Sequence, residues 1–288
     1  MLVTGGTGYV GAEVVASLAS AGHSLRVLVH SGQPSLPEAA EPVRGDISDA
    51  ASVEAAAAGC DAIVNLVAIL NGPDAAFQAI NAGGPRNVVA AANAHGIRRV
   101  VHMSALGVSA EHAPLTRYWG SKYAGKQAVV TSDLDWTVFE PSFVFGRGGG
   151  ALKAFEGLIR LPVAPVIGDG RYRHQPVWAG DVATAFVRAL ERPETAGKVI
   201  ALGGPQVFTF DELLDELARV TGRAPRRKLH APAGLVKAQT PLLSRLPPPL
   251  KVTREQIVML LAGTECDLGQ MRSALGIEPA SIAEAYTR

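Results

Sequence analysis

The sequence contains a tyrosine and a lysine spaced for proton transfer, Tyr118 and Lys122, four positions apart in a stretch with helical periodicity. At this spacing two side chains share one face of a helix. Because an ammonium group beside a phenol favours the phenolate, we expect Lys122 to lower the pKa of Tyr118. Tyr118 would then exchange a proton with a substrate hydroxyl or carbonyl near neutral pH.

A serine completes this candidate catalytic set. Ser104 lies 14 residues before Tyr118, directly after the apolar run Arg99–Met103, which has the pattern of a buried strand. Ligands of open α/β sheets bind at such strand ends, so the Ser104 hydroxyl is placed to hydrogen-bond the same substrate oxygen. The alternative is a surface tyrosine and lysine with a capping serine. We favour the catalytic set because a glycine-rich loop precedes it in the chain.

That loop opens the chain, where the apolar run Met1–Thr4 continues into Gly5-Gly6-Thr7-Gly8-Tyr9-Val10-Gly11 and then into a helical pattern. Gly5 permits a tight turn, Gly8 lets the backbone approach a pyrophosphate, and Gly11 permits close helix packing. The amino end of the helix adds free N–H groups and a positive dipole end. The loop therefore predicts dinucleotide binding, with a plain strand–turn–helix joint as the alternative.

The end of the second apolar run, Val29-His30-Ser31-Gly32, bears on the choice of cofactor. NAD-specific sites offer a carboxylate to the ribose 2′-OH about 20 residues past the glycines, and this stretch has none. A carboxylate would repel a 2′-phosphate, whereas His30 can carry positive charge and Ser31 can donate a hydrogen bond. We therefore expect NADP(H) to be favoured over NAD(H). The alternative is a solvated His30 and binding of either cofactor.

Strand and helix patterns alternate over about the first 200 residues, which predicts βαβ units and an α/β fold with a doubly wound parallel sheet. The predicted strands are Met1–Thr4, Ser24–Val29, Pro42–Arg44, Asp61–Ala68, Arg99–Met103, Thr137–Phe139 and Lys198–Leu202. The predicted helices between them are Ala12–Ala21, Ala50–Ala58, Ala75–Ala94, Arg117–Val130 and Asp181–Leu190.

The pattern changes after Phe145. We expect residues 1–146 to form a dinucleotide-binding Rossmann domain to which 176–203 returns. Residues 147–175 and 204–288 would form a smaller, discontinuous, mostly helical C-terminal lobe for a substrate or partner. A flexible break is expected at 146–150 and an extended proline linker at 247–249.

Composition excludes several classes of protein. The net charge of +1 argues against a nucleic-acid binder, and no apolar run is long enough to be a transmembrane segment. Two distant cysteines indicate reduced thiols, and a chain that begins inside a strand leaves no room for a signal peptide, so we expect a cytoplasmic protein. Seven histidines without paired ligand spacing predict no metal site.

These motifs resemble the short-chain dehydrogenase/reductase family, specifically its extended and atypical branches. The likeness is carried by the glycine loop and by Gly45-Asp46, Asn65-Leu66-Val67-Ala68, Asn81, Asn87-Val88, Ser104-Ala105-Leu106-Gly107, Tyr118-x-x-x-Lys122, Pro141-Ser142-Phe143-Val144-Phe145-Gly146 and Gln175-Pro176-Val177 with Asp181-Val182-Ala183. The Ser-Ala-Leu-Gly and Gln-Pro-Val phrases are similar to the branch containing the NADPH-binding accessory subunit of respiratory complex I and its bacterial relatives.

The resemblance implies roles for particular residues. Asp46 and Ile47 would meet the adenine, Val67 and Ala68 would line the path to the nicotinamide, and Pro141 and Phe143 would lie near it. Tyr118 would be the general acid/base, Lys122 would also bind the nicotinamide ribose, and Ser104 would steady the substrate oxygen. For Asp46 a helix or turn cap is the alternative.

The implied activity is an NAD(P)H-dependent oxidoreductase that moves hydride to or from a carbonyl or alcohol carbon. Epimerisation or dehydration through a transient ketone uses the same three side chains. A different class is a low-turnover NADPH-binding subunit or sensor. The expected partners are a small carbonyl or alcohol substrate and, beyond it, a second copy of the chain or a larger complex.

Two features depart from the family pattern. The first strand begins at Met1 and is shorter than usual, and Glu140 stands before Pro141 where relatives often have arginine. We expect Glu140 to pair with Arg147 or Arg173, and the alternative is a negative charge beside the nicotinamide end that alters substrate choice. The basic cluster Arg223 to Lys228 is explained by a helix carboxyl end, with an acidic membrane surface or partner as the other interpretation. The apolar, proline-punctuated stretch Leu229–Leu250 would cover the pocket or dock on a partner or lipid surface.

Overall fold

The structure is a computed structural model that describes residues 1–146, 149–243, 245–246 and 252–287. The chain divides into two compact units. The sheet unit comprises Met1–Pro141, Ala179–Leu202 and Leu268–Ile277, and the second unit comprises Ser142–Trp178, Gly203–Asp267 and Glu278–Arg288. These two units are defined by how tightly the chain packs, not by what they bind. The predicted division into a cofactor-binding domain and a substrate or partner lobe therefore stays a prediction.

In the described part of the sheet unit, seven parallel strands form one sheet in the order β12-β6-β5-β4-β1-β2-β3. Their bounds are β1 Leu2–Thr4, β2 Leu25–Val29, β3 Ala40–Arg44, β4 Ala62–Asn65, β5 Arg99–Met103, β6 Asp135–Pro141 and β12 Lys198–Leu202. The order runs outward in opposite directions from the β1–β4 pair, which makes this pair the topological switch point. The predicted doubly wound parallel sheet is confirmed.

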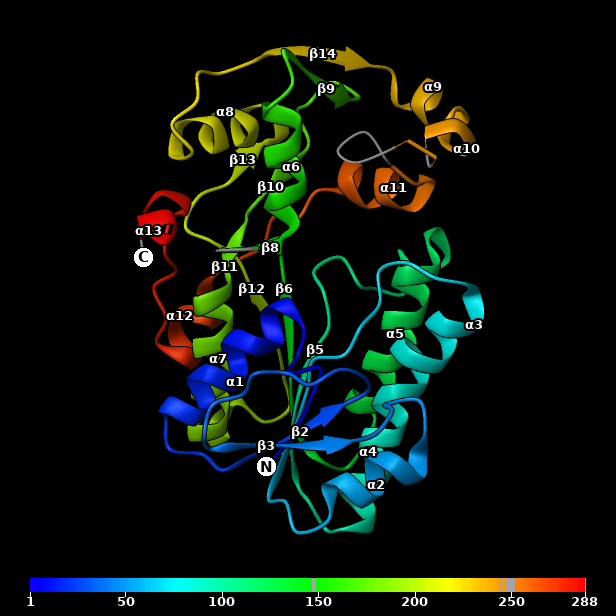
Figure 1. Ribbon diagram of the computed structural model, residues 1–288, viewed down its shortest axis with the longest axis vertical. Helices are drawn as coiled ribbons and strands as arrows, with labels where there is room; N and C mark the ends of the chain where they lie inside the picture. The colour runs from blue at the N-terminus through cyan, green and yellow to red at the C-terminus, as the bar shows by residue number, and fades with distance from the viewer. Residues whose placement is uncertain (147–148, 244, 247–251, 288) are drawn as a thin grey trace. The chain divides into compact units, whose positions relative to one another are not determined.

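Helices cover both faces of this sheet (Figure 1). On one face α1 (Tyr9–Ser20) packs against α7 (Ala179–Glu191), with α12 (Gly269–Leu275) beside α7 and β12. On the other face α2 (Ala50–Ala57), α4 (Gly84–Ala94) and α5 (Arg117–Val130) pack in sequence. Short helices complete the unit: α3 (Asp74–Ala76), η2 (Ala113–Leu115) and η3 (Pro193–Thr195). Strands covered on both faces are mostly apolar, which is why β1 begins with an apolar run.

The predicted helix 75–94 contains a π-helix, η1 (Phe77–Gly83), between α3 and α4. Within it Asn81 is 1% exposed and packs toward α5. Its amide donates to the carbonyl of Ile69 (3.0 Å) and to Oγ of Ser121 (3.2 Å), and its oxygen accepts from the Ile69 N–H (2.8 Å). π-Helical turns are frequent at functional sites, and this one ties the loop after β4 to α5.

The second unit has a core formed by α6 (Ala151–Ile159), α8 (Phe210–Val220) and α13 (Ile282–Thr287). Its small sheets pair β7 (Val144–Gly146) with β8 (Gly149–Gly150) and β11 (Val177–Trp178), β10 (Arg173–His174) with β13 (Phe208–Thr209), and β9 (Val163–Ile167) with β14 (Arg227–Ala231). The remaining helices are α9 (Ala233–Ala238), α10 (Thr240–Leu243) and α11 (Arg254–Ala262). Residues 147, 148 and 247–249 of the predicted break and linker lie outside the described residues.

The contact between α5 and the π-helix depends on Gly125. A Cβ added there would overlap the carbonyl oxygen of Asn81. We expect Gly125→Ala to lower the free energy of unfolding by about 1–3 kcal/mol, because overpacking forces backbone shifts. The control is Gly234→Ala in α9, where an added Cβ meets nothing within 4 Å. It should be neutral or stabilising by up to about 1 kcal/mol. Thermal unfolding checks both, and equal stability of Gly125→Ala and the wild type would contradict the packing argument.

Candidate active site

The register of the parallel strands brings several predicted site residues to one edge of the sheet. Thr4 of β1 pairs with Asn65 of β4, and Asn65 pairs with His102 of β5. The glycine loop, the Val67 loop and Ser104 therefore all start at the carboxyl edge of neighbouring strands. This edge, beside the switch point, is where open α/β sheets bind ligands.

The glycine loop is built around two close approaches. Gly5 has φ +76°, and a Cβ there would lie 2.8 Å from the backbone nitrogen of Val67. A Cβ on Gly11 would overlap the carbonyl oxygen of Gly5, so the first turn of α1 rests on the loop itself. Helix α1 begins at Tyr9, earlier than the predicted Ala12. Its N-cap is Gly8, which offers no side-chain cap, so the amino end of α1 keeps its N–H groups for a ligand.

Other side chains of the loop face solvent or the interior. Thr7 and Gly8 are exposed, and Tyr9 and Val10 are partly buried. The Tyr9 hydroxyl is buried without a hydrogen-bond partner among the described residues. Burial, together with the nearby Glu13, raises the pKa of Tyr9 to about 12.

A row of buried hydrogen bonds crosses three strands beneath this edge. Thr4 Oγ1 donates to Asn65 Oδ1 at 2.8 Å, and the Asn65 amide donates to His102 Nδ1 at 3.2 Å. Because the amide nitrogen only donates, His102 carries its proton on Nε2. Burial, with Lys122 nearby, lowers the pKa of His102 well below its ordinary value, so the ring is neutral. Sequence reasoning missed this row; its signal was a polar residue at or near the carboxyl end of each of three apolar strands.

Two asparagines hold the loops that carry predicted cofactor contacts. Asn65 accepts from the Val67 N–H at 3.3 Å, and Asn87 donates to the carbonyl of Ile47 at 2.9 Å. Ile47 is 6% exposed, Val67 is partly buried and Ala68 is exposed. The backbone at Val67 and Ile47 is therefore held by these side-chain amides.

The three candidate catalytic residues are all buried. Ser104 is 3% exposed, and its hydroxyl has no partner within the described part of the chain. Tyr118 lies in the first turn of α5, after the Thr116 N-cap, whose Oγ1 accepts from the Trp119 N–H at 3.0 Å. Lys122 is 1% exposed, and its Nζ donates to the carbonyl of Met103 at 2.5 Å, one residue before Ser104.

The expected effect of Lys122 on Tyr118 is not seen. Burial raises the pKa of Tyr118 to about 12, and burial lowers the pKa of Lys122 to about 8 against the opposing attraction of Glu140. The prediction that Lys122 lowers the pKa of Tyr118 is therefore wrong for this state. The physical reason is that the phenol loses its hydration while the ammonium is bonded to the Met103 carbonyl instead.

Glu140 has a different partner from the predicted arginines. Its Oε1 lies 2.9 Å from Nζ of Lys126, one turn beyond Lys122, and both side chains are nearly buried, at 14% and 13%. Lys126 also donates to the carbonyl of Val108 at 2.7 Å. Arg173 pairs with Glu265 in the second unit, and Arg147 lies outside the described residues. Lys122 and Lys126 thus hold the two ends of the Ser104 loop.

At the end of β2 and β3 the structure brings His30 and Asp46 together. His30 Nε2 lies 3.5 Å from Asp46 Oδ2. His30 and Ser31 are exposed, and Asp46 is partly buried. Asp46 Oδ1 accepts from the Ser48 N–H (2.9 Å) and hydroxyl (2.8 Å). These hydrogen bonds, the backbone one first, lower the pKa of Asp46. Asp46 therefore caps a turn, and its contact with adenine stays a prediction.

The structure does not place every predicted site residue in the sheet unit. Pro141 ends β6, and its carbonyl accepts from the Leu106 N–H at 3.0 Å. Phe143 belongs to the second unit, where its ring lies 4.7 Å from the His174 ring and 5.7 Å from the Phe155 ring. His174 is fully buried, and burial lowers its pKa to about 4.

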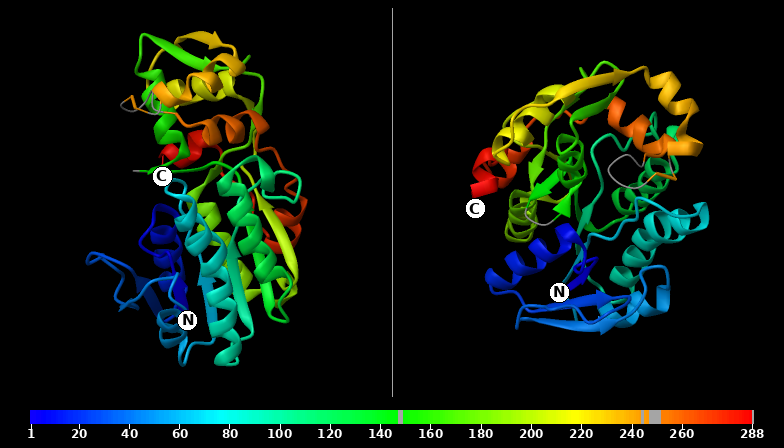
Figure 2. Two further views of the ribbon diagram at one scale, coloured as in Figure 1. Left: turned by 90° about the vertical axis from the view of Figure 1, so that its right-hand side faces the viewer. Right: turned by 45° about the horizontal axis from the view of Figure 1, so that its top comes forward.

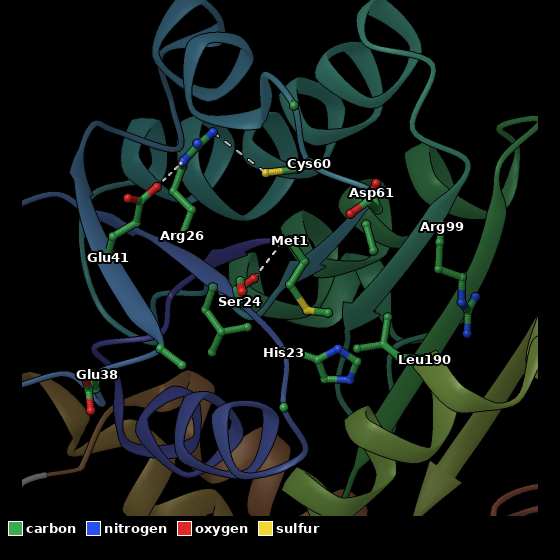
Figure 3. Close-up of a pocket in the computed structure, with 15 residues that line it drawn as sticks. Met1, His23, Ser24, Arg26, Glu38, Glu41, Cys60, Asp61, Arg99 and Leu190 are labelled. Atoms are coloured by element: carbon green, nitrogen blue, oxygen red, sulfur yellow. Dashed lines mark hydrogen bonds and ion pairs between the residues drawn. The ribbon is translucent and has the colours of Figure 1, made fainter.

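A hollow of about 840 Å³ opens in the sheet unit, at the amino ends of the strands (Figure 3). Met1, His23, Arg26, Cys60 and Arg99 are among the residues that line it, and Arg26 is paired with Glu41 at 2.9 Å. It is therefore at the opposite edge from the predicted site.

Within the described residues, no group of three or more His, Cys, Asp or Glu side chains is arranged to hold a metal ion. No helix among them is long and apolar enough to cross a membrane.

Comparison with known proteins decides the family. The NAD dependent epimerase/dehydratase family matches residues 1–203. The chain belongs to this family. It is a family of nicotinamide-cofactor proteins of the extended short-chain dehydrogenase/reductase type, as the sequence motifs predicted.

Individual family members are similar over most of the chain. A Streptomyces griseus protein named (4-alkanoyl-5-oxo-2,5-dihydrofuran-3-yl)methyl phosphate reductase is 32% identical over 87% of this chain and 83% of its own length. The Arabidopsis thaliana NADH dehydrogenase [ubiquinone] 1 alpha subcomplex subunit 9, mitochondrial, is 28% identical over 78% of this chain but only 58% of its own length. The predicted likeness to the complex I subunit branch is thereby confirmed.

A solved structure supports the fold. A nucleoside-diphosphate-sugar epimerase from Staphylococcus aureus matches the whole of this chain and 99% of its own with a TM-score of 0.78, at 15% identity. At this identity the match shows a shared fold and does not indicate a shared substrate.

The buried ammonium of Lys122 gives a pH-dependent stability. The pKa of Lys122 in the folded chain, about 8, lies below the ordinary 10.5. Between these values the unfolded chain binds a proton that the folded chain has released, so stability rises with pH. Lys122→Met removes this term. From pH 7 to pH 10 we expect the unfolding free energy of the wild type to gain about 2–3 kcal/mol relative to the variant.

Denaturant titrations of both proteins at several pH values measure this difference. The control is Lys126→Met, one turn further along the same helix. It leaves Glu140 nearly buried and unpaired, and we expect a loss of about 3 kcal/mol at pH 7. If the difference in unfolding free energy between the wild type and Lys122→Met does not change with pH, the Lys122 ammonium is not buried.

Proposed function

We propose that this chain is an NADP(H)-dependent oxidoreductase that interconverts a carbonyl and an alcohol on a small molecule. The observation that carries the proposal is the buried set at the carboxyl edge of the sheet, in which the Ser104 hydroxyl has no partner in the described protein. Burying an unpaired hydroxyl is costly, so such a group is retained where a ligand supplies the missing hydrogen bond.

The residues of the sheet unit fit a dinucleotide. The glycine loop and the uncapped amino end of α1 would hold the pyrophosphate, and Ile47 with Asp46 would meet the adenine. Val67, Ala68, Pro141 and Lys122 would border the ribose and nicotinamide. The cofactor, when bound, supplies or accepts the hydride. The domain of 1–146 and 176–203 would then bind the cofactor, and the lobe of 147–175 and 204–288 would bind the substrate.

The protonation states suit carbonyl reduction. With a pKa of about 12, Tyr118 is a neutral phenol that can donate its proton to a developing alkoxide. Ser104 would donate a second hydrogen bond to the same oxygen. The Lys122 ammonium, freed from the Met103 carbonyl or shared with it, would stabilise the phenolate that remains. In the oxidation direction the same phenolate takes the proton of the alcohol.

The names of the relatives support a reductase, and one of them also supports a second function, a low-turnover NADPH-binding role. The Streptomyces griseus relative is named as a reductase, and the family name includes epimerases and dehydratases, which pass through a ketone with the same side chains. The likeness to the complex I subunit supports a low-turnover NADPH-binding role, docked in a larger complex or as a homodimer. A cytoplasmic location stays a prediction.

Tyr118→Phe distinguishes catalysis from cofactor binding. We expect NADPH oxidation with a panel of ketones, aldehydes and quinones to fall by at least about 100-fold, because the proton donor is lost. NADPH binding, followed by fluorescence titration, should change little. The matched control is Tyr123→Phe, on the next turn of the same helix, which should keep full turnover. If the wild type binds NADPH but turns over no substrate, the low-turnover role replaces the enzyme.

The 2′-phosphate assignment is tested at His30. We expect NADPH to bind at least about fivefold more tightly than NADH, and His30→Ala to weaken NADPH binding while leaving NADH binding unchanged. His95→Ala, which removes an exposed histidine elsewhere in the sheet unit, is the control. Equal NADPH and NADH affinities in the wild type would refute the assignment.

A further inference from the structure

Positive charge is concentrated in one part of the second unit. Residues 217–254 contain nine of the 27 lysines and arginines of the chain and no aspartate or glutamate. The chain as a whole carries only +1, so this segment is a local excess and not a general property. Segregated charge of one sign indicates a surface that meets a partner of the opposite sign.

The strand pair β9–β14 shows which side of this segment faces inward. Lys228 and His230 of β14 bind the α8 carboxylates of Asp215 (2.7 Å) and Asp211 (3.0 Å). On the same face Val166 of β9 is 1% exposed and belongs to the core of the second unit. Because side chains alternate along a strand, the other face of the pair points away from that core.

The outward face combines leucines with arginine. Arg227 is exposed and pairs in register with Val163 (42% exposed), and Leu229 follows at 66%. The chain continues into α9 and α10, where Leu235 (55%) and Leu242 (65%) are also exposed and stand seven residues apart. In Figure 1 and Figure 2 these elements lie together at one end of the second unit. We call these five residues the basic–apolar face.

The composition of this face points to one kind of partner. Seven large hydrophobic side chains are exposed among the described residues, and four of them lie on the basic–apolar face. Leucines flanked by arginines, with no acidic side chain in the segment, match a membrane interface, where acyl chains receive the leucines and anionic headgroups attract the cations. A protein surface would need a one-signed acidic patch to match it. We propose that the basic–apolar face docks the protein on an anionic lipid bilayer.

Docking of this kind is peripheral and is independent of the proposed catalytic role. The leucines would enter only the headgroup and upper acyl region. Arg227, with the exposed Arg223, Arg245 and Arg254 of the same segment, would lie at the level of the lipid phosphates. Binding should therefore depend on both anionic lipid and low salt.

Vesicle flotation of the full-length protein tests the proposal without substrate or cofactor. The probes are vesicles of phosphatidylcholine alone and of phosphatidylcholine with about a third phosphatidylserine. We expect binding only to the second, weakened as salt rises. Arg227→Glu should reduce binding by at least about fivefold, since each cation near such a surface contributes about that factor. Leu229→Ser with Leu235→Ser should reduce it by tenfold or more.

Matched controls lie in the sheet unit. Leu115→Ser removes a leucine that is 54% exposed, and Arg86→Glu reverses an exposed charge, and both should bind vesicles as the wild type does. Thermal unfolding confirms that every variant is folded. Three results would each overturn the proposal: no binding to anionic vesicles, equal binding by the face and control variants, or a change of oligomeric state in the face variants, which would assign the surface to a second copy of the chain.

Discussion

The candidate site depends on the hydrogen-bonded row that joins Thr4, Asn65 and His102 across three strands. Burial of both faces already sets the register of these strands through their apolar packing, and a buried hydrogen-bonded row specifies that register further. Thr4 Oγ1, the Asn65 side chain and His102 Nδ1 are paired across the strands, so a slip would leave buried donors and acceptors unpaired. His102 Nε2 has no partner among the described residues. The row therefore aligns the carboxyl ends from which the glycine loop, the Val67 loop and Ser104 depart.

A second constraint comes from two lysines on α5, Lys122, which is buried, and Lys126, which is nearly buried. Lys122 and Lys126 bind the carbonyls of Met103 and Val108, so one helix face holds both ends of the Ser104 loop. Burial of these charges is tolerated because each has a close acceptor and because Glu140 lies nearby. Beside this loop the Ser104 hydroxyl is a buried polar group without a hydrogen-bond partner among the described residues. A buried, unpaired donor of this kind is prepared for a ligand oxygen.

Charge is segregated in the second unit. The α8 carboxylates pair with Lys228 and His230 on one side of β14, while Arg227 is exposed on the other side. Since the chain is almost neutral overall, this segregation cannot be seen in the net charge. It depends on strand parity, because successive residues of β14 point to opposite sides.

The doubly wound sheet and the family could be inferred from the sequence, because alternating apolar runs and glycine spacing are local signals. The close approaches of Gly5 and Gly11 were also readable, since only glycine fits where backbones touch. Three features could not be predicted from the sequence: the partner of Glu140, the protonation of Tyr118, and the row through Asn65 and His102. Each depends on contacts between residues distant in the chain, and on how much water folding removes from a charged or polar group. A local pattern specifies which side chains are available. Only the packed structure decides which acceptor the Lys122 ammonium binds and how much hydration the buried Tyr118 phenol loses.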